Sequence, residues 1–198
     1  ERFCDRFPRT AWGKDIGIKL AGAGGDGAQT AALLLARAAI NEGFDATHIP
    51  SYGPESRGGT SYADVRIAED EVLSPAAPEP HVLVAFNAPS VARFAPHVPE
   101  GGVVVYDSGV VAQLPALRPG VKAVGVPFTQ VAAGLGKIIV KNIVALGALQ
   151  EATRLFPPDT FLAAVRQALS DKCALIPLNE EAFARGQARA AEAGKGDA

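Results

Sequence analysis

The chain has 198 residues, of which 48% are hydrophobic, a length and composition that suit one domain with its own buried core. Nineteen basic residues against 21 acidic ones leave a formal net charge of −2. That balance argues against the strongly basic surface by which proteins bind nucleic acid.

In chain order, the sequence predicts an N-terminal arm over residues 1–15, a single domain over 16–193 and a frayed tail over 194–198. The domain opens with an apolar strand at 16–21, a glycine-rich turn and an Ala- and Leu-rich helix at 29–41. A second short strand is expected at 46–49.

Residues 61–67 alternate between apolar and polar side chains, which indicates a half-buried strand with its tyrosine and charges in solvent. A short return strand is expected at 71–75. Three further apolar strands, at 81–87, 102–108 and 121–127, are spaced as in a parallel sheet. The remainder is predicted to be helical, in three helices over about 131–156, 159–172 and 179–193. The pattern predicts an α/β fold with a mostly parallel sheet flanked by helices, a β-hairpin addition and a helical C-terminus.

The two cysteines, Cys4 and Cys173, lie near opposite ends of the chain and form no CxxC pair. The sequence therefore predicts neither a disulfide framework nor a zinc or iron–sulfur site, and each thiol is expected to be buried or incidental. The first residues lack the apolar segment of a signal peptide, and no apolar run approaches the roughly 20 residues that span a bilayer. We expect a cytoplasmic protein with no membrane partner.

The glycine-rich turn, GAGGDG, places Gly22, Gly24 and Gly27 in the GxGxxG pattern between a strand and a helix, where backbone N–H groups can approach a phosphate. A dinucleotide site also needs an acidic residue at the end of the second strand, and Asp45 precedes that strand instead. Asp26 would repel a pyrophosphate. Three interpretations stay open: a dinucleotide site, a turn that only lets strand and helix pack closely, or a site for another anion or a partner.

Residues 51–60 read SYGPESRGGT and form the most specific signal in the chain. They follow the second strand at the sheet edge that also carries the glycine turn, where ligand crevices of α/β sheets lie. Arg57 could pair with Glu55, clamp a phosphate or carboxylate, or reach a neighbouring chain. The alternative is a self-contained surface turn.

Taken together, these segments resemble a known family. GAGGDG, a helix, SYGPESRGGTSYADV, the strand PHVLVAFN and KNIVALG at 141–147 are similar to the gamma subunit of the 2-oxoacid:ferredoxin oxidoreductases, over about residues 16–151. The combination of GPExRGG with GxGGxG is much more specific than either half. Asp26 stands where the family more often has Gln.

The resemblance implies a Rossmann-like domain in an assembly that oxidatively decarboxylates a 2-oxoacid to an acyl-CoA. Its alpha, beta and delta-type (ferredoxin-like) subunits, in some arrangements with a further electron-transfer subunit, would carry thiamine diphosphate with Mg²⁺ and [4Fe-4S] clusters. This chain would hold no catalytic residue and no cofactor of its own, because the chemistry belongs to those cofactors. The form SYGPESRGGT favours the 2-oxoglutarate or aryl-glyoxylate branch.

Transferred position by position, the resemblance places one set of residues at the CoA channel or at a subunit junction. These are Gly22, Gly24, Gly25, Asp26, Gly27, Tyr52, Gly53, Pro54, Glu55, Arg57, Gly58 and Gly59.

Three further polar residues are secondary candidates. Lys137 and Lys141, four residues apart on a predicted helix, would share a face that meets an acidic partner, a CoA phosphate or only solvent. Asn142 interrupts an apolar stretch and, if buried, needs a partner, which the glycine turn could supply. The three histidines are not spaced as metal ligands, so no metal site is predicted.

The main alternative is a free-standing nucleotide-binding Rossmann-like protein, which would need a complete acidic ribose site. A small NAD-dependent enzyme would need a catalytic Tyr/Lys or His/Asp set, and none is apparent.

Overall fold

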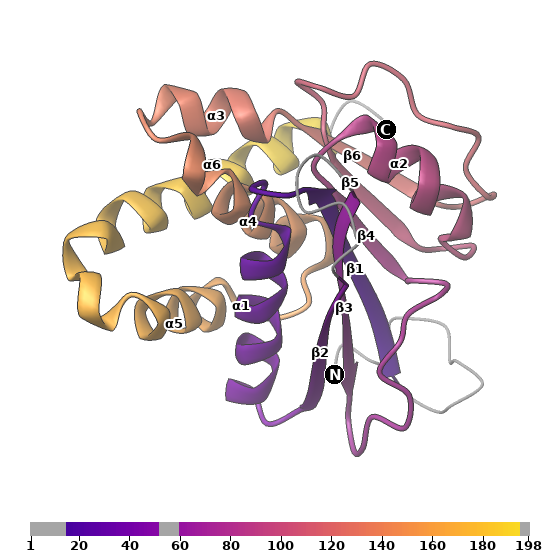
Figure 1. Ribbon diagram of the computed structural model, residues 1–198, viewed down its shortest axis with the longest axis horizontal. Coiled ribbons are helices and arrows are strands. Elements are labelled where there is room, and N and C mark those ends of the chain that lie inside the picture. The colour runs from indigo at the N-terminus through magenta and orange to yellow at the C-terminus, as the bar shows by residue number, and fades with distance from the viewer. Residues whose placement is uncertain (1–14, 52–59, 195–198) are drawn as a thin grey trace.

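The computed structural model describes residues 15–51 and 60–194, which fold around one six-stranded sheet in the order β2-β3-β1-β4-β5-β6 (Figure 1). The strands are β1 (Asp15–Ala23), β2 (Asp45–Ser51), β3 (Thr60–Ala68), β4 (Val82–Ala85), β5 (Val103–Asp107) and β6 (Lys122–Val126). β1, β4, β5 and β6 pair in parallel, whereas β3 runs antiparallel between β1 and β2. The predicted α/β fold with a mostly parallel sheet is confirmed.

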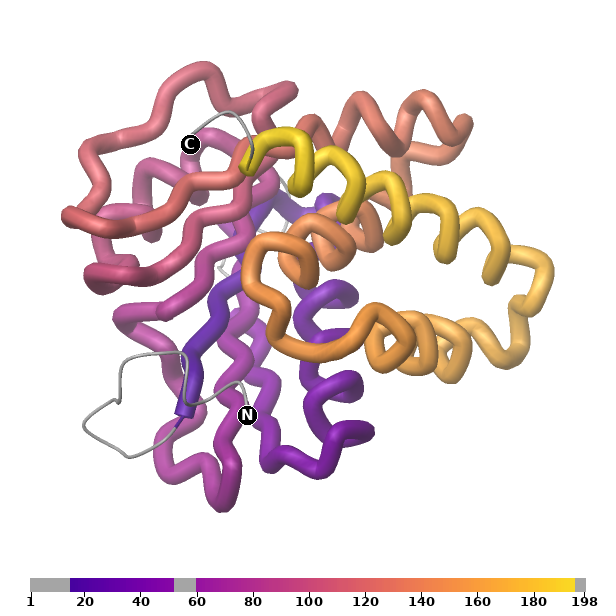
Figure 2. The backbone as a smooth tube through the Cα atoms, turned by 180° about the vertical axis from the view of Figure 1, so that it is seen from behind, coloured from indigo at the N-terminus to yellow at the C-terminus, as the bar shows by residue number. Residues whose placement is uncertain are grey.

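Helices cover both faces of the sheet. One face shares a core with α1 (Ala28–Asn41), α3 (Phe128–Gly134), α4 (Lys141–Thr153), α5 (Pro158–Ala168) and α6 (Ile176–Ala193). The other face packs on α2 (Ala88–Phe94) and the short η2 (Ala95–His97). Figure 2, seen from behind, shows α5 and α6 extending away from the sheet, joined by η4 (Ser170–Leu175). None of the described helices is long and apolar enough to cross a membrane.

The hairpin is formed by β2 and β3, and the predicted return strand at 71–75 is wrong. Residues 69–81 form no strand, and prolines there remove ladder donors. Side chains of β3 bind the backbone of this segment instead: Asp64 accepts the N–H of Ala77 at 3.1 Å, and Arg66 Nε donates to the carbonyl of Ser74 at 3.1 Å.

The charged residues of β3 are buried, so the prediction that they face solvent is also wrong. Lys19 forms an ion pair with Asp64, and Arg66 lies 3.3 Å from Asp15, with all four residues at most 8% exposed. The Lys19 ammonium also lies 4.4 Å from the centre of the Tyr62 ring. Alternation alone cannot distinguish a solvated face from one covered by a connecting segment, and opposite charges on adjacent strands make the covered face possible.

The helix predicted over 131–156 is broken into α3, the short η3 (Ile138–Val140) and α4. Gly136, at φ +79°, and the extended backbone of Lys137, at φ −143°, interrupt it. Glycine adopts this left-handed conformation without steric cost, which is why the chain turns here. α4 then crosses α6 closely: a Cβ added at Gly186 would lie 2.1 Å from the carbonyl oxygen of Val144.

Candidate functional site

The glycine turn closes the carboxyl end of β1 and leads directly into α1. Gly25 and Gly27 have φ angles of +96° and +84°, and Gly27 is the N-cap of α1. Gly24 is not among the glycines with positive φ. Gly25 and Gly27 therefore supply the left-handed backbone conformation of this turn, which glycine adopts without steric cost.

Gly27 makes the close approach in the turn. A Cβ added there would lie 2.8 Å from Cβ of Asn142, which is buried on α4. At Gly25 the same Cβ would meet nothing within 4 Å. Asn142 therefore packs closely against the glycine turn, and this packing requires glycine at position 27 in particular. That the turn supplies a polar partner to its amide stays a prediction.

Asp26 is neutralised within the turn. One carboxylate oxygen accepts the backbone N–H of Ala23 at 2.7 Å, and the other forms an ion pair with Lys141 at the start of α4. Both side chains are only 16% exposed. The expectation that Asp26 would repel an anion is therefore wrong, since the neighbouring ammonium cancels its charge.

Lys137 and Lys141 do not share a helical face, contrary to the prediction. Lys137 precedes η3 and is exposed, whereas Lys141 is the first residue of α4 and turns toward Asp26. The glycine-induced break separates the two lysines, so only Lys137 remains available to a ligand or partner.

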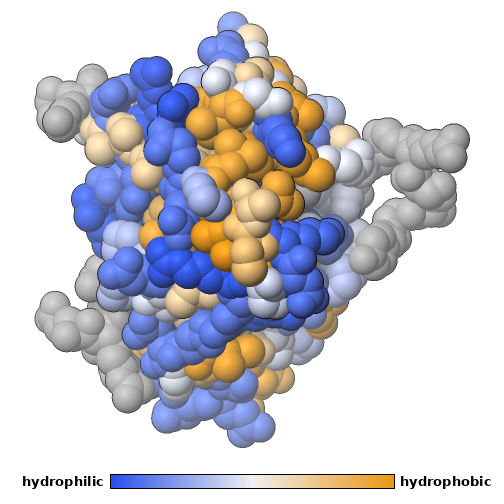
Figure 3. Space-filling model, turned by 90° about the vertical axis from the view of Figure 1, so that its left-hand side faces the viewer, coloured by the Kyte–Doolittle hydropathy of each residue, from blue (hydrophilic) through white to orange (hydrophobic). Residues whose placement is uncertain are grey.

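A cavity of about 610 Å³ opens beside the glycine turn. Its walls come from the turn, the first turns of α1, the η3–α4 junction, the C-terminal end of α5, η4 and the start of α6. The lining is largely apolar, and Lys137 and Lys172 contribute its cationic groups. Figure 3 shows the side of the molecule on which these helices lie, with hydrophobic surface bordered by hydrophilic residues. A volume and lining of this kind suit a small-molecule site.

Sequence reasoning missed five polar residues of this cavity: Gln29, Thr30, Ser61, Lys172 and Asn179. Gln29 left a signal, because it is polar in the first turn of an otherwise Ala- and Leu-rich helix. Lys172 left none, since its position depends on how the α5–η4–α6 segment folds back.

Residues 52–59 of the SYGPESRGGT motif lie outside the described residues. The candidates that fall there are Tyr52, Gly53, Pro54, Glu55, Arg57, Gly58 and Gly59. Their flanking residues are described: Ser51 ends β2, and Thr60 begins β3 opposite Ala23 of β1. Both attachment points therefore lie at the sheet edge of the glycine turn, as the sequence predicts.

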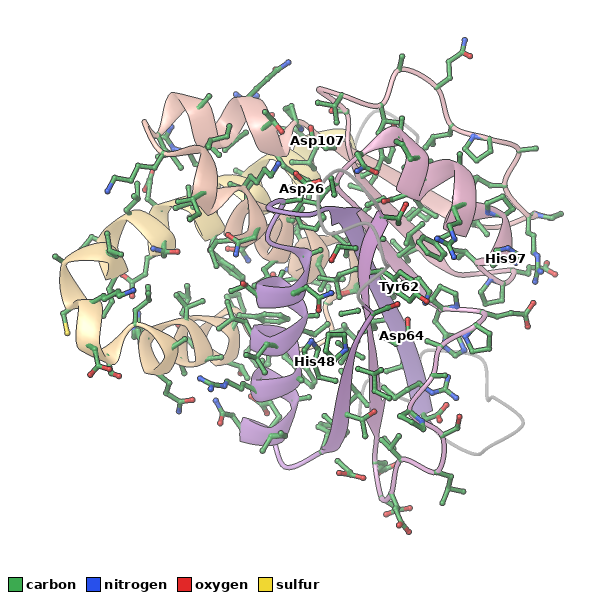
Figure 4. The ribbon with its side chains drawn as sticks, viewed as in Figure 1. Asp26, His48, Tyr62, Asp64, His97 and Asp107 are labelled. Carbon is green, nitrogen blue, oxygen red and sulfur yellow. The ribbon has the colours of Figure 1, made fainter. Side chains whose placement is uncertain are left out.

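Other polar groups near this edge are used internally. Asp107, which lies at the same edge as Asp26 in Figure 4, accepts the N–H and hydroxyl of Thr129 and the N–H of Gly109, at 2.6–3.1 Å. Asp45 accepts the N–H of Val72 at the opposite end of β2, so it cannot serve as a ribose-binding acid beside the glycine turn.

The described residues contain no group of three or more His, Cys, Asp or Glu side chains that could hold a metal ion. Cys173 is exposed rather than buried. His48, on β2, is partly buried with an unpaired Nε2 within the described part of the chain, and burial lowers its pKa. It lies well away from Asp26 in Figure 4.

The fold is an open α/β domain with a cavity beside the glycine turn, at the carboxyl edge of its sheet. The structure superposes with a TM-score of 0.80 and 31% identity on the gamma subunit of a keto/oxoacid ferredoxin oxidoreductase from Geobacter sulfurreducens, covering 90% of this chain and 98% of that one. Residues 17–189 match the pyruvate ferredoxin/flavodoxin oxidoreductase family, and the chain belongs to it. The resemblance seen in the sequence is confirmed.

Two relatives show the range of this family. The chain is 38% identical over 167 residues to ketoisovalerate oxidoreductase subunit VorA of Methanothermobacter marburgensis, covering 84% of this chain and 34% of VorA. It thus spans about a third of that relative. It is 34% identical over 150 residues to 2-oxoglutarate synthase subunit KorC of Methanocaldococcus jannaschii, covering 75% of this chain and 80% of KorC.

A further structural match is 2-oxoglutarate:ferredoxin oxidoreductase from Magnetococcus marinus, solved with 2-oxoglutarate, coenzyme A and succinyl-CoA bound. The TM-score is 0.80 at 27% identity, and the match covers 90% of this chain and 31% of that one. These comparisons do not favour the free-standing nucleotide-binding protein.

Proposed function

We propose that this chain is a gamma-type subunit, or the gamma-type part of a longer subunit, of a 2-oxoacid:acceptor oxidoreductase. The assembly would oxidatively decarboxylate a 2-oxoacid and transfer the acyl group to CoA. Membership of the family and the names of the relatives support this role. The observation that carries the role of this chain is the cavity of about 610 Å³ beside the glycine turn.

The chemistry of the cavity suits CoA. Its apolar walls would accommodate the pantetheine arm, and Lys137 and Lys172 would attract the phosphates. The Asp26–Lys141 pair adds no net charge, so it leaves that attraction intact. When bound, CoA would supply the thiol that accepts the acyl group, while this chain would bind and orient it.

Within this proposal, the glycine turn and residues 52–59 border the CoA channel or meet a neighbouring subunit, and Arg57 is the cation of the second segment. Lys137 belongs to the channel, and Asn142 supports the turn. Lys141 neutralises Asp26 and does not contact CoA.

The chain itself does not fit the redox cofactors of such an assembly. A [4Fe-4S] cluster takes four cysteine thiolates, and the sequence contains two cysteines. We therefore assign thiamine diphosphate with Mg²⁺ and the clusters to alpha, beta and delta-type partner subunits, in the cytoplasm.

For the substrate, we propose an acid of the 2-oxoglutarate or aryl-glyoxylate class, as the SYGPESRGGT motif favours. The KorC relative, a 2-oxoglutarate synthase subunit, is consistent with the first of these. Comparing turnover of 2-oxoglutarate, phenylglyoxylate and 2-ketoisovalerate by the purified complex tests this choice, and a preference for ketoisovalerate would refute it.

The test of the CoA channel is a double charge reversal, Lys137→Glu with Lys172→Glu, in the assembled complex. We expect the apparent KM for CoA to rise about tenfold or more, because charge-assisted contacts to phosphate are worth roughly 1.5–3 kcal/mol. Reduction of the clusters by 2-oxoacid without CoA should be unchanged. Lys122→Glu, at the exposed start of β6, is the matched control.

An unchanged KM for CoA in the double variant would exclude the cavity as the CoA channel. A lower yield of intact complex at normal KM would place a subunit junction there instead.

A further inference from the structure

Gln29, in the first turn of α1, binds two strands at once. Its side-chain Nε2 donates to the carbonyl oxygen of Tyr62 at 2.9 Å and to Oγ of Ser61 at 3.1 Å, and it lies 3.4 Å from the carbonyl oxygen of Ser51. Carbonyl oxygens only accept hydrogen bonds, so the amide nitrogen must face these groups.

These three partners lie at the end of β2 and the start of β3. Ser51 is the cross-strand partner of Tyr62, and Ser61 lies opposite Gly22 of β1. One amide therefore ties α1 to the last residues of β2 and the first residues of β3, next to the glycine turn. Residues 52–59 join the two strands that it holds.

The environment of Gln29 points to a positional role. The α1 residues that face the core around it, Ala28, Ala31 and Ala32, are small and apolar. A partly buried amide among them costs free energy unless its groups are paired, and Oε1 of Gln29 has no partner within the described residues. Packing alone would be served better by an apolar side chain. Both Gln29 and Ser61 line the cavity, so the amide fixes one of its walls.

We propose that Gln29 is a positioning residue of the CoA site. By holding Ser51, Ser61 and Tyr62 against the start of α1, it sets the distance between the glycine turn and the strand ends that carry residues 52–59. This inference rests on the proposed function, since it names the residue that shapes the proposed CoA site.

The test compares two variants of Gln29 in the assembled complex. Gln29→Met keeps the length of the side chain and removes the donor, whereas Gln29→Lys restores a donor. The control is Gln187→Met, which removes a similar amide: Gln187 donates to Gln150 at 2.6 Å between α6 and α4, and neither residue lines the cavity. The readouts are the apparent KM for CoA, cluster reduction by 2-oxoacid without CoA, and hydrogen exchange of peptides covering 45–51 and 60–68.

We expect Gln29→Met to raise the KM for CoA about tenfold, the effect of losing one to two hydrogen bonds, with unchanged CoA-independent reduction. Exchange in both peptides should quicken. Gln29→Lys should return the KM for CoA and the exchange rates most of the way to their wild-type values, and Gln187→Met should leave both unchanged.

The proposal is overturned if Gln29→Met leaves the KM for CoA at the wild-type value, even if exchange quickens, because Gln29 would then be structural only. It is also overturned if Gln29→Lys is as impaired as Gln29→Met. If the wild-type complex shows no dependence on CoA, the proposed function is refuted instead. Faster exchange in Gln29→Met would then still support the contact of Gln29 with both strand ends.

Discussion

Asp26 and Lys141 neutralise each other's charge at the glycine turn. A lysine in the first turn of a helix is disfavoured by the helix dipole, and a carboxylate inside a turn of backbone amides competes with any anionic ligand. Paired, the two charges cancel, and Asp26 in addition accepts the N–H of Ala23. The pair also ties the turn to α4, 115 residues further along the chain.

We predict that Lys141→Met lowers the free energy of unfolding by about 1–3 kcal/mol, because it leaves the mostly buried Asp26 carboxylate without its cation. Urea denaturation of Lys141→Met, Asp26→Asn and the double variant forms a complete cycle. The double variant should lose less than the sum of the single losses, since removing both charges leaves neither unpaired. Strict additivity would mean that the pair is not coupled.

His48 predicts a pH dependence of stability. Burial lowers its pKa in the folded protein below the ordinary 6.5, so the unfolded chain binds more protons in this range. Its contribution is therefore fully present above about pH 6.5 and is lost as the pH falls toward the lowered value. Comparing wild type with His48→Gln between about pH 5 and 8 should show a shallower slope in the variant. Equal slopes would assign the pH dependence to other groups.

At the scale of elements, the crossing of α4 and α6 depends on glycine. A Cβ at Gly186 would lie 2.1 Å from a backbone carbonyl oxygen of α4, and backbone cannot yield as a flexible side chain can. We predict that Gly186→Ala destabilises the protein by about 1–3 kcal/mol or more.

The control for that prediction is Gly134→Ala, at the end of α3, where an added Cβ meets nothing within 4 Å. Alanine favours helix by up to about 1 kcal/mol over glycine, so this variant should be neutral or slightly stabilised. Thermal and urea melts of both variants check the pair. Similar losses in the two would show that the close crossing is not the cause.

The elements that the sequence predicts well are those with strong local signals. The apolar strands β4, β5 and β6 and the helix α1 lie where their patterns place them. The failures are tertiary in origin. Local alternation cannot reveal that residues 74–77 cover the charges of β3. Likewise, Gly136 and the extended Lys137 interrupt a helix that composition alone predicted as continuous.

The features of the candidate site likewise divide into those that a local sequence signal predicts and those that depend on tertiary structure. Gly27 and Asn142 could be linked because a motif and an interrupted apolar stretch each left a local sign. The ion pair of Asp26 with Lys141 depends on how α4 docks, and the contribution of Lys172 depends on the α5–η4–α6 segment. Neither of these two features can be predicted from the spacing of residues along the sequence.

For the whole molecule, we predict that the chain alone neither oxidises a 2-oxoacid nor binds an iron–sulfur cluster, because two cysteines cannot ligate one. Mixing it with the partner subunits should restore CoA-dependent turnover. The measurements are 2-oxoacid-dependent dye reduction and iron content of the purified chain and of the complex. Turnover by the isolated chain would refute both the prediction and the proposed division of labour.

Because β3 runs antiparallel to β2, Ser51 at the end of β2 and Thr60 at the start of β3 lie at the same edge of the sheet. A connection between two strand ends at one edge of a sheet can become longer with little effect on the strands, since closing a longer loop costs only about 0.6 kcal/mol for each doubling of its length. Had β3 been parallel to β2, a crossover of a dozen or so residues would have been needed instead. The reversed strand thus makes this edge a place where insertions of different length and composition can be accommodated while the sheet keeps its order and register.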